Sequence, residues 1–446
     1  MSIVSIVLLS FFMAAPEGSA DRPIWSQFRG PTGSGESSSP ELPAIWNEET
    51  NIAWKTPVPG SGWSQPVVVN GKVFVTSAVS PDGGKPMKMT EGSSDRRSMF
   101  GDSKPPETIF RWELHCYDLE TGKPLWTNKL AEQKSGLPTH PSNTFATETA
   151  AVDAKRVYAY FGSIGKLFCT DHDGKTEWEA DLGVYKMTSG LGTGSSPIVV
   201  GDKVVVQCYN EENSFLVALD GANGKEVWRA KRANGTSWST PYLWQRSDRT
   251  ELIACGKSRV YAYNPADGSI YWEMGGIVGG FAATPVANKD YLFLGNNGPL
   301  SPAPLLAVKA GANGDITPPK GVKTTDQIPW SRLKSGPGLS SPVVLGEELY
   351  TSNDSFLNCY DIKTGERIYR ERLPEARNIV ASPLVWDGKL YILDEEGRTF
   401  IVRGGRSFDL VGTNKLEDTF WASPAIAGDR LLLRGVEKLY CVKGSP

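Results

Sequence analysis

A short hydrophobic stretch, interrupted by one tight turn, recurs along the whole chain. Residues 195–207 read SSPIVVGDKVVVQ, residues 340–353 read SSPVVLGEELYTSN, and residues 382–394 read SPLVWDGKLYILD. Each stretch joins a small residue and Pro to a pair of apolar residues, a Gly-containing turn and a second, largely apolar run. Apolar and β-branched runs separated by such a turn are typical of a β-hairpin. The pattern therefore predicts repeated hairpins, and amphipathic helical periodicity is hard to find.

Each hairpin is followed by a third apolar run and by a turn that leads to a fourth. The third run reads ELHCYD, KLFCTD, FLVALD or FLNCYD, and the fourth ends in Trp, as in HDGKTEW. Units of about 40 to 50 residues with four strands are the period of propeller blades. Eight positions begin the units: Pro66, Glu148 (where Pro is lost), Pro197, Pro241, Pro285, Pro342, Pro383 and Pro424. We predict an all-β, eight-bladed propeller of four-stranded antiparallel blades, or seven blades if the fifth unit is too degenerate.

The last unit ends after its third strand, at KLYCVK. The stretch NIAWKTPVPG has no blade of its own, and its Trp54 matches the blade-ending Trp. We expect residues 51–59 to complete blade eight and close the ring, because closure removes exposed sheet edges. The expected organisation is a signal peptide (1–20), an N-terminal extension (21–50) and the propeller (51–446). Two insertions, around Ser80–Ile109 and Pro299–Pro329, are expected as loops.

The cysteines and tryptophans fit this repeat. Cys116, Cys169, Cys359 and Cys441 share one repeat position with Ala218 and Ala262, which predicts a small buried slot rather than disulfides. An aromatic residue at the end of each blade is expected to dock on the next blade and to donate its N–H to a backbone carbonyl. The predicted docking residues are Trp54, Trp126, Trp178, Trp228, Trp272 and Tyr369, with none in units five and seven.

The charge of the chain and its N-terminal sequence indicate which partners and which cellular location to expect. The chain has 47 Lys and Arg against 50 Asp and Glu, without a basic cluster, which argues against nucleic acid. Ile3 to Ala15 is apolar but too short to span a bilayer, and the small residues up to Ala20 fit a signal-peptidase site. We expect an exported, periplasmic or extracellular monomer with no membrane span after cleavage; an uncleaved anchor is the alternative. No Cys precedes Cys116, so a lipid-modified N-terminal Cys is not expected.

The repeat resembles a known family. Segments such as CYDLETGKPLW and ALDGANGKEVW are similar to the tryptophan-docking repeat of pyrroloquinoline-quinone-type propellers. That superfamily includes quinoprotein alcohol dehydrogenases and the outer-membrane barrel-assembly lipoprotein. The N-terminal WSQFRGP segment resembles exported bacterial proteins described as quinone-binding-like repeat proteins. The chain departs from the dehydrogenases, since no two Cys are adjacent and no set of Glu, Asn and Asp ligands for calcium emerges from one motif.

Candidate site residues surround the predicted channel mouth. Trp63, Trp238 and Trp421 each lie three residues before their Pro and either stack on a planar ligand or pack against neighbouring blades. Glu148 on an innermost strand is costly to bury unless it is paired or solvated. It either pairs with Arg377 across the channel or forms an anion or metal pocket with Asn143, Arg377 and Asn378. His spacing and Cys spacing predict no metal site.

Two functions are carried forward. The first is an exported, non-catalytic scaffold that binds an envelope protein, a peptide or a glycan and needs no cofactor. The alternative is a quinoprotein oxidoreductase acting on alcohols or sugars, which requires pyrroloquinoline quinone with Ca²⁺. Fold alone does not choose between them, because function depends on the site.

Overall fold

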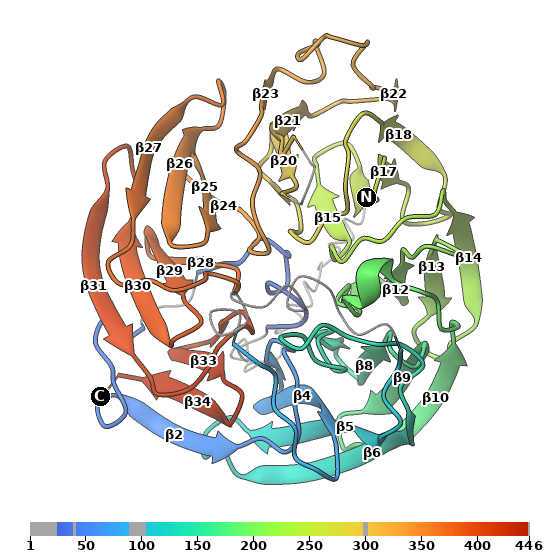
Figure 1. Cartoon of the computed structure of the whole chain (residues 1–446), viewed down its shortest axis with the longest axis vertical. Helices are drawn as coiled ribbons and strands as arrows, with labels where there is room; N and C mark the ends of the chain where they lie inside the picture. Colours follow the sequence, from blue (N-terminus) through green and yellow to red (C-terminus); the bar gives the residue numbers. More distant parts are fainter. Residues whose placement is uncertain (1–24, 39–41, 89–103, 298–301, 445–446) are drawn as a thin grey trace, which may run out of the picture.

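The protein is a closed ring of eight β-sheets around a central axis (Figure 1). This computed structural model describes residues 25–38, 42–88, 104–297 and 302–444. The sequence prediction of an all-β, eight-bladed propeller is confirmed, and the seven-bladed alternative is wrong. The predicted signal segment, residues 1–20, lies outside the described residues.

Each blade has four antiparallel strands, from the channel outward. The innermost strands are β3 (Val67–Val69), β7 (Ala151–Val152), β11 (Ile198–Val200), β15 (Tyr242–Gln245), β19 (Val286–Ala287), β24 (Val343–Leu345), β28 (Leu384–Trp386) and β32 (Ala425–Ala427). The second strands are β4 (Lys72–Val79), β8 (Arg156–Phe161), β12 (Lys203–Cys208), β16 (Thr250–Cys255), β20 (Tyr291–Gly295), β25 (Glu348–Asn353), β29 (Lys389–Leu393) and β33 (Arg430–Arg434).

The outer half of each blade follows the same order. The third strands are β5 (Ile109–Asp118), β9 (Lys166–Asp171), β13 (Phe215–Asp220), β17 (Val260–Tyr263), β21 (Leu305–Lys309), β26 (Phe356–Asp361), β30 (Arg398–Arg403) and β34 (Lys438–Lys443). The outermost strands are β6 (Pro124–Lys134), β10 (Thr176–Asp181), β14 (Glu226–Lys231), β18 (Ile270–Met274), β23 (Trp330–Arg332), β27 (Arg367–Arg372), β31 (Asp409–Lys415) and β2 (Ile52–Pro57).

The ring closes through the strand from the N-terminal side of the chain. Strand β2 pairs antiparallel with β34, and Trp54 lies opposite Cys441. In Figure 1 the two strands lie side by side at the edge of blade eight. The predicted closure by residues 51–59 is confirmed, with the strand itself at Ile52–Pro57.

The predicted insertion around Pro299–Pro329 is only partly an insertion. It contains β21, the third strand of blade five, which pairs with β20 and with β23. The added segment follows β21, and its strand β22 (Gly314–Asp315) pairs in parallel with β18 of blade four. The sequence prediction missed β21 because the neighbouring Gly and Pro residues conceal its short apolar run.

The segment predicted as an N-terminal extension enters the central channel. Trp25 exchanges two backbone hydrogen bonds with Val68 of β3 (2.9 and 2.8 Å), and the N–H of Val152 donates to Ser26 O at 2.7 Å. Further along, strand β1 (Glu36–Ser37) pairs in parallel with β28. The segment therefore satisfies polar backbone groups at the inner edges of several blades, groups that would otherwise need solvent.

Arg29 anchors this channel segment. Its side chain is buried, and its Nη2 donates to Pro342 O and to Ser34 O, both at 2.6 Å. Gly35 has a φ of +79°, and a Cβ at this position would lie 3.0 Å from Pro383 O. Burial lowers the pKa of Arg29 to about 10. The motif QFRGP is thus part of a plug, defined here as residues 25–37.

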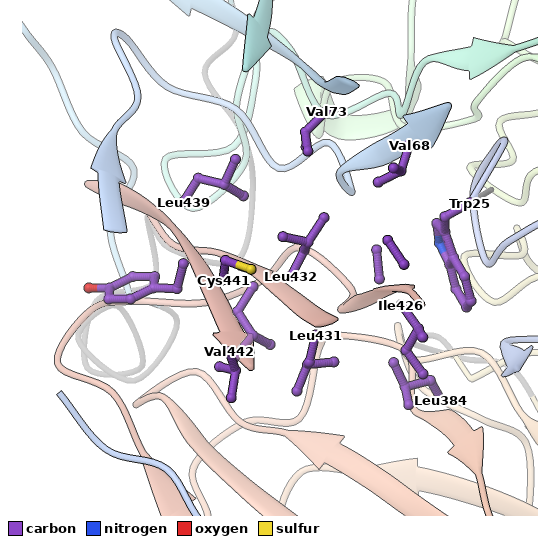
Figure 2. Close-up of a cluster of buried hydrophobic side chains, with 14 of the residues drawn as sticks. Trp25, Val68, Val73, Leu384, Ile426, Leu431, Leu432, Leu439, Cys441 and Val442 are labelled. Carbon is purple, nitrogen blue, oxygen red and sulfur yellow. The ribbon is translucent and has the colours of Figure 1, made fainter. Parts of the chain in front are cut away.

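The hydrophobic core lies between blades rather than at the ring centre. Separate buried clusters join neighbouring sheets, for example β8 and β9 with β12 and β13. The cluster at the ring closure also includes Trp25 and Trp46 from the N-terminal segment. Figure 2 shows Trp25 in this cluster together with Val68 and Ile426 of two innermost strands. The apolar contacts between the blades are therefore continuous with those that Trp25 of the plug makes.

Candidate functional site

A ring of hydrogen bonds sets the register of the innermost strands. In seven of the eight blades, the residue before the strand-opening position donates its N–H to a hydroxyl on the next blade. The bonds are Gln65 N to Thr149 Oγ1, Thr149 N to Ser196 Oγ, Ser196 N to Thr240 Oγ1, Thr240 N to Thr284 Oγ1, Thr284 N to Ser341 Oγ, Ser341 N to Ser382 Oγ and Ser382 N to Ser423 Oγ. Gln65 makes the eighth contact by donating its side-chain Nε2 to Pro424 O at 2.6 Å.

This ring corrects the alignment of blade two. Thr149 is the ring hydroxyl and β7 begins at Ala151, so Ala150 occupies the Pro position. Glu148 lies two residues earlier in the alignment, at the position of Ser195 and Ser239. The hydroxyl residue directly before Pro, which recurs in most units, was the sequence signal that gives the correct register.

The seven predicted channel-mouth residues lie at the face where the innermost strands begin. We name this the upper face and the opposite one the lower face. The links between blades and the turns between second and third strands also lie on the upper face. The seven residues do not form one site there, because six of them separate into two groups held by different blades and Arg377 is exposed.

The first group lies at blades seven, eight and one. Trp63 and Trp421 stack on each other, with ring centroids 5.6 Å apart and planes at 19°. Trp421 Nε1 donates to Glu395 Oε1 at 2.8 Å, and Asn378 Nδ2 donates to Glu395 Oε2 at 3.3 Å. We name Trp63, Trp421, Asn378 and Glu395 the Glu395 cluster. Sequence analysis missed Glu395, which follows β29 in the turn EEG.

The second group lies at blades two to four. Asn143 Nδ2 donates to Leu191 O at 3.0 Å, and Trp238 Nε1 donates to Gly192 O at 2.8 Å. Both residues therefore hold the segment before β11, near Gly194. In the described part of the chain, no ring contact joins Trp238 to the stacked pair. Asn143 and Trp238 thus hold the segment near Gly194, which lines the same pocket as Glu148.

Glu148 is buried, with 1% of its surface exposed. Its Oε1 accepts from the N–H of Gly162 at 3.2 Å, and a Cβ at residue 162 would lie 2.9 Å from that oxygen. Within the described residues its Oε2 has no hydrogen-bond partner. Burial raises the pKa of Glu148 to about 7, because the charged form loses solvation. The Thr193 side chain lies close enough to the carboxylate to oppose this rise in its pKa.

The expected Glu148–Arg377 ion pair is absent from the described residues. Arg377 is exposed, and its backbone N–H donates to Asp394 Oδ2 at 3.0 Å. The two residues belong to different sides of the ring, since Arg377 precedes blade seven. The prediction assumed an open channel, whereas residues 25–37 occupy it between the innermost strands.

A small pocket opens beside Glu148 between blades two and three. We name it the Glu148 pocket; its accessible volume is about 30 Å³. Its inner wall includes Tyr160, Gln207 and Tyr209, and Tyr185 and Met187 line it from the loop before β11. That loop carries the 3₁₀ helix η2 (Thr188–Gly190). Gln207 Oε1 is buried and, like Glu148 Oε2, lacks a partner.

The blade-ending aromatic residues lie against the next blade. Five indoles donate to its backbone: Trp54 to Leu119 O, Trp126 to His172 O, Trp178 to Gly221 O, Trp228 to Pro265 O and Trp330 to Ile362 O. Trp272 instead donates to Glu251 Oε2 of its own blade at 2.7 Å, and Tyr369 packs edge-on against Phe408. Trp330 shows that unit five does contain the residue, displaced by the segment after β21.

The turn glycines make this docking fit. Gly122 has a φ of +68°, and a Cβ there would lie 2.4 Å from the Trp54 ring. The residue opposite each aromatic residue is small, as for Cys116 opposite Trp126. Blade seven reverses the sizes, with Ile401 opposite Gly412. The six cysteines are buried and free, and burial raises the pKa of the Cys116 thiol to about 12.

The residues do not fit a channel-bound quinone with calcium. The stacked Trp63–Trp421 pair leaves no gap between its rings for a third plane, and Trp238 belongs to another group. Residues 25–37 fill the axis at the depth of the innermost strands. Within the described ranges, no group of three or more His, Cys, Asp or Glu side chains is arranged to hold a metal ion.

The sequence is similar to those of two curated outer membrane protein assembly factors. The outer membrane protein assembly factor BamB of Yersinia pestis is 23% identical over 325 residues, covering 72% of this chain and 77% of that protein. The corresponding protein of Burkholderia pseudomallei is 24% identical over 248 residues, covering 52% of this chain and 61% of that protein.

Solved structures show the same fold at low identity. BamB from Moraxella catarrhalis superposes with a TM-score of 0.58 at 12% identity, covering 88% of this chain and 97% of that one. Quinohemoprotein alcohol dehydrogenase from Comamonas testosteroni gives a TM-score of 0.51 at 14% identity, covering 95% and 81%. These identities support the propeller fold and no shared activity.

The family model described as outer membrane protein assembly factor BamB matches residues 111–368, which is more than half of the chain. The matched region runs from the third strand of blade one to the outermost strand of blade six. The chain therefore belongs to this family of pyrroloquinoline-quinone-like repeat propellers.

Proposed function

We propose that the protein is an exported, non-catalytic propeller that docks an envelope protein on its upper face. The observation that carries the proposal is the plug, residues 25–37, which fills the channel at the depth of the innermost strands. Recognition must then use the outer surface. Membership of a family named for outer membrane protein assembly supports a protein partner over a peptide or a glycan.

The upper face offers apolar contacts for such a partner. Val278 and Leu339, in the links before blades five and six, are 58% and 44% exposed. Val184 and Leu333 in neighbouring links are also exposed. We propose that these four side chains provide the apolar contacts for the partner.

The blade-one insertion reaches across the same face. Lys85 pairs with Glu437 at 3.5 Å and Lys88 pairs with Glu396 at 3.3 Å, linking the insertion to blades eight and seven. The backbone N–H of Met87 donates to Pro141 O at 2.9 Å. Residues 85–88 therefore contact the upper face at blades seven and eight and at the link before blade two. In the described residues, no helix is long and apolar enough to cross a membrane.

Site-specific photocrosslinking in the native host tests the proposal. A photoreactive residue at Val278 or Leu339 is expected to capture one defined envelope protein. The matched controls are Thr121 and Asn223, exposed lower-face turn residues, which are expected to capture none. Equal capture from both faces would contradict the proposal. Saturable binding of pyrroloquinoline quinone with Ca²⁺ by the purified protein would instead support the oxidoreductase alternative.

A further inference from the structure

The Glu148 pocket presents acceptors without donors. Glu148 Oε2 and Gln207 Oε1 are both buried and unpartnered, and both residues line the pocket. Buried polar atoms without partners are rare in folded proteins, and a bound water, ion or ligand group is one explanation for them. The other side of each residue is engaged, since Gln207 Nε2 donates to Ser239 O at 2.8 Å.

The donors of the inner wall are directed elsewhere. Ser195 Oγ donates to Ser239 O at 3.0 Å, and Ser237 Oγ donates to Cys255 O at 2.6 Å. Asn210 Nδ2 donates to Cys208 O and Asn213 O, both at 2.9 Å. The Tyr160 hydroxyl lies 3.4 Å from Cys208 Sγ. The side-chain donors of Ser195, Ser237 and Asn210 are therefore already engaged and do not favour a ligand that accepts hydrogen bonds, such as an anion or a carbonyl.

We propose that the Glu148 pocket binds a primary alkylammonium group, whose N–H donors reach Glu148 Oε2 and Gln207 Oε1. The accessible volume of about 30 Å³ suits one head group of about the size of a water molecule. Tyr185 and Met187 line the pocket from the loop before β11, where they provide an apolar wall for the alkyl chain.

Charge favours an ammonium over a neutral donor. Within the described residues, the Glu148 carboxylate has no ion-pair partner, and a buried carboxylate is stabilised by a cation placed against it. A bare metal ion is a poorer match, because Ca²⁺ takes six to eight oxygens and the pocket offers two free ones. This inference goes beyond partner docking and stands independently of it, since it concerns a pocket between blades two and three and not the exposed apolar residues Val278 and Leu339.

Isothermal titration calorimetry of the full chain with n-butylammonium tests the proposal. We expect saturable one-to-one binding that n-butanol, tetramethylammonium and KCl at matched ionic strength do not reproduce, since each lacks the charge or the N–H donors. The E148Q variant is expected to bind more than about tenfold more weakly, because a charge-assisted hydrogen bond is lost. The matched control E395Q, which changes a buried carboxylate of the Glu395 cluster, is expected to bind normally.

A second variant keeps the test valid if E148Q does not fold. Gln207→Met preserves the shape of the side chain, removes only the amide, and is expected to weaken binding. Unchanged binding in the folded E148Q variant would overturn the proposal, as would an equal response to KCl. The absence of saturable binding would mean that the pocket holds water alone and would also overturn it.

The same titration distinguishes the sources of the ligand. Nα-acetyl-lysine methylamide carries a butylammonium-like side chain on a peptide backbone. Binding at least as tight as that of n-butylammonium would assign the pocket to a lysine side chain of a protein. Binding of n-butylammonium alone would assign it to a free amine. Failure of both would leave docking on the upper face untouched, because that proposal depends on Val278 and Leu339.

Discussion

Two buried carboxylates near the channel mouth differ in how they are satisfied. Glu395 is fully buried, and each of its oxygens accepts a hydrogen bond, from Trp421 Nε1 and from Asn378 Nδ2. Glu148 is buried to the same degree and lines the pocket, but only Oε1 accepts a backbone N–H, and Oε2 has no hydrogen-bond partner among the described residues. The first carboxylate ties blades seven and eight together, whereas the second is free to engage a ligand.

The comparison shows that burial alone does not identify a site. Both carboxylates lose solvation. The number of hydrogen bonds that each accepts separates the structural carboxylate from the one proposed to bind a ligand. The sequence suggested that Trp63 and Trp421 either stack on a planar ligand or pack against neighbouring blades. In the structure they stack on each other, and Trp421 donates a hydrogen bond to Glu395.

The largest effect is expected from Glu395→Ala. This change leaves the Trp421 and Asn378 donors unpaired, at about 1–3 kcal/mol each. The apparent free energy of unfolding is expected to fall by about 4 kcal/mol, measured by urea denaturation with Trp fluorescence. If Glu395→Ala lowers the free energy of unfolding by no more than Glu148→Ala does, the proposed difference between the two carboxylates is wrong.

Glu148→Gln is expected to change the pH dependence of stability. The pKa of Glu148 is raised to about 7 in the folded protein, so stability is fully retained below the unfolded pKa and is lost as pH rises through 7. At pH 8 the variant is expected to be more stable than the wild type by about 3 kcal/mol, from 1.36 kcal/mol per unit of pKa shift. Below pH 4 the two proteins are expected to be equally stable in urea titrations. Parallel pH profiles would contradict the assignment.

Gly162→Ala is expected to disturb the Glu148 pocket. Its Cβ would lie 2.9 Å from Glu148 Oε1 and from Thr193 Cβ, and such overpacking costs about 2 kcal/mol. Thermal unfolding followed by circular dichroism measures the change. Gly194→Ala is the matched control, because its Cβ would lie 3.7 Å from its nearest neighbours. A control as destabilised as the test variant would argue against a steric effect.

Trp421→Phe is expected to have the smallest effect. Stacking on Trp63 is kept, but Glu395 Oε1 loses the N–H that lies at 2.8 Å. Loss of one hydrogen bond is expected to lower the free energy of unfolding by about 1 kcal/mol, measured by urea denaturation. Ammonium binding is expected to stay unchanged in calorimetry, and a weakened affinity would show that the two regions are coupled.

The sequence by itself determined the fold to a large extent. Alternating apolar runs, Gly-containing turns and a repeating Trp fix four strands per blade, because each strand pair and each Gly–Trp contact depends on local neighbours. The pairing of Trp54 with the last blade was also predictable, since one unit lacked a strand and one strand lacked a unit. The prediction failed at β21 and Trp330, where an added segment separates the third strand of blade five from the fourth.

Only the tertiary structure decided the site. The ring of hydroxyl contacts shows that Ala150, and not Glu148, occupies the Pro position of blade two. The structure also shows that Arg29 and its neighbours fill the channel. Whether Trp63 stacks on Trp421, and whether Glu148 meets Arg377, depends on the orientation of the side chains and on what lies between them in the channel. Such contacts join residues hundreds of positions apart, and their hydrogen-bond partners exist only after the ring has closed.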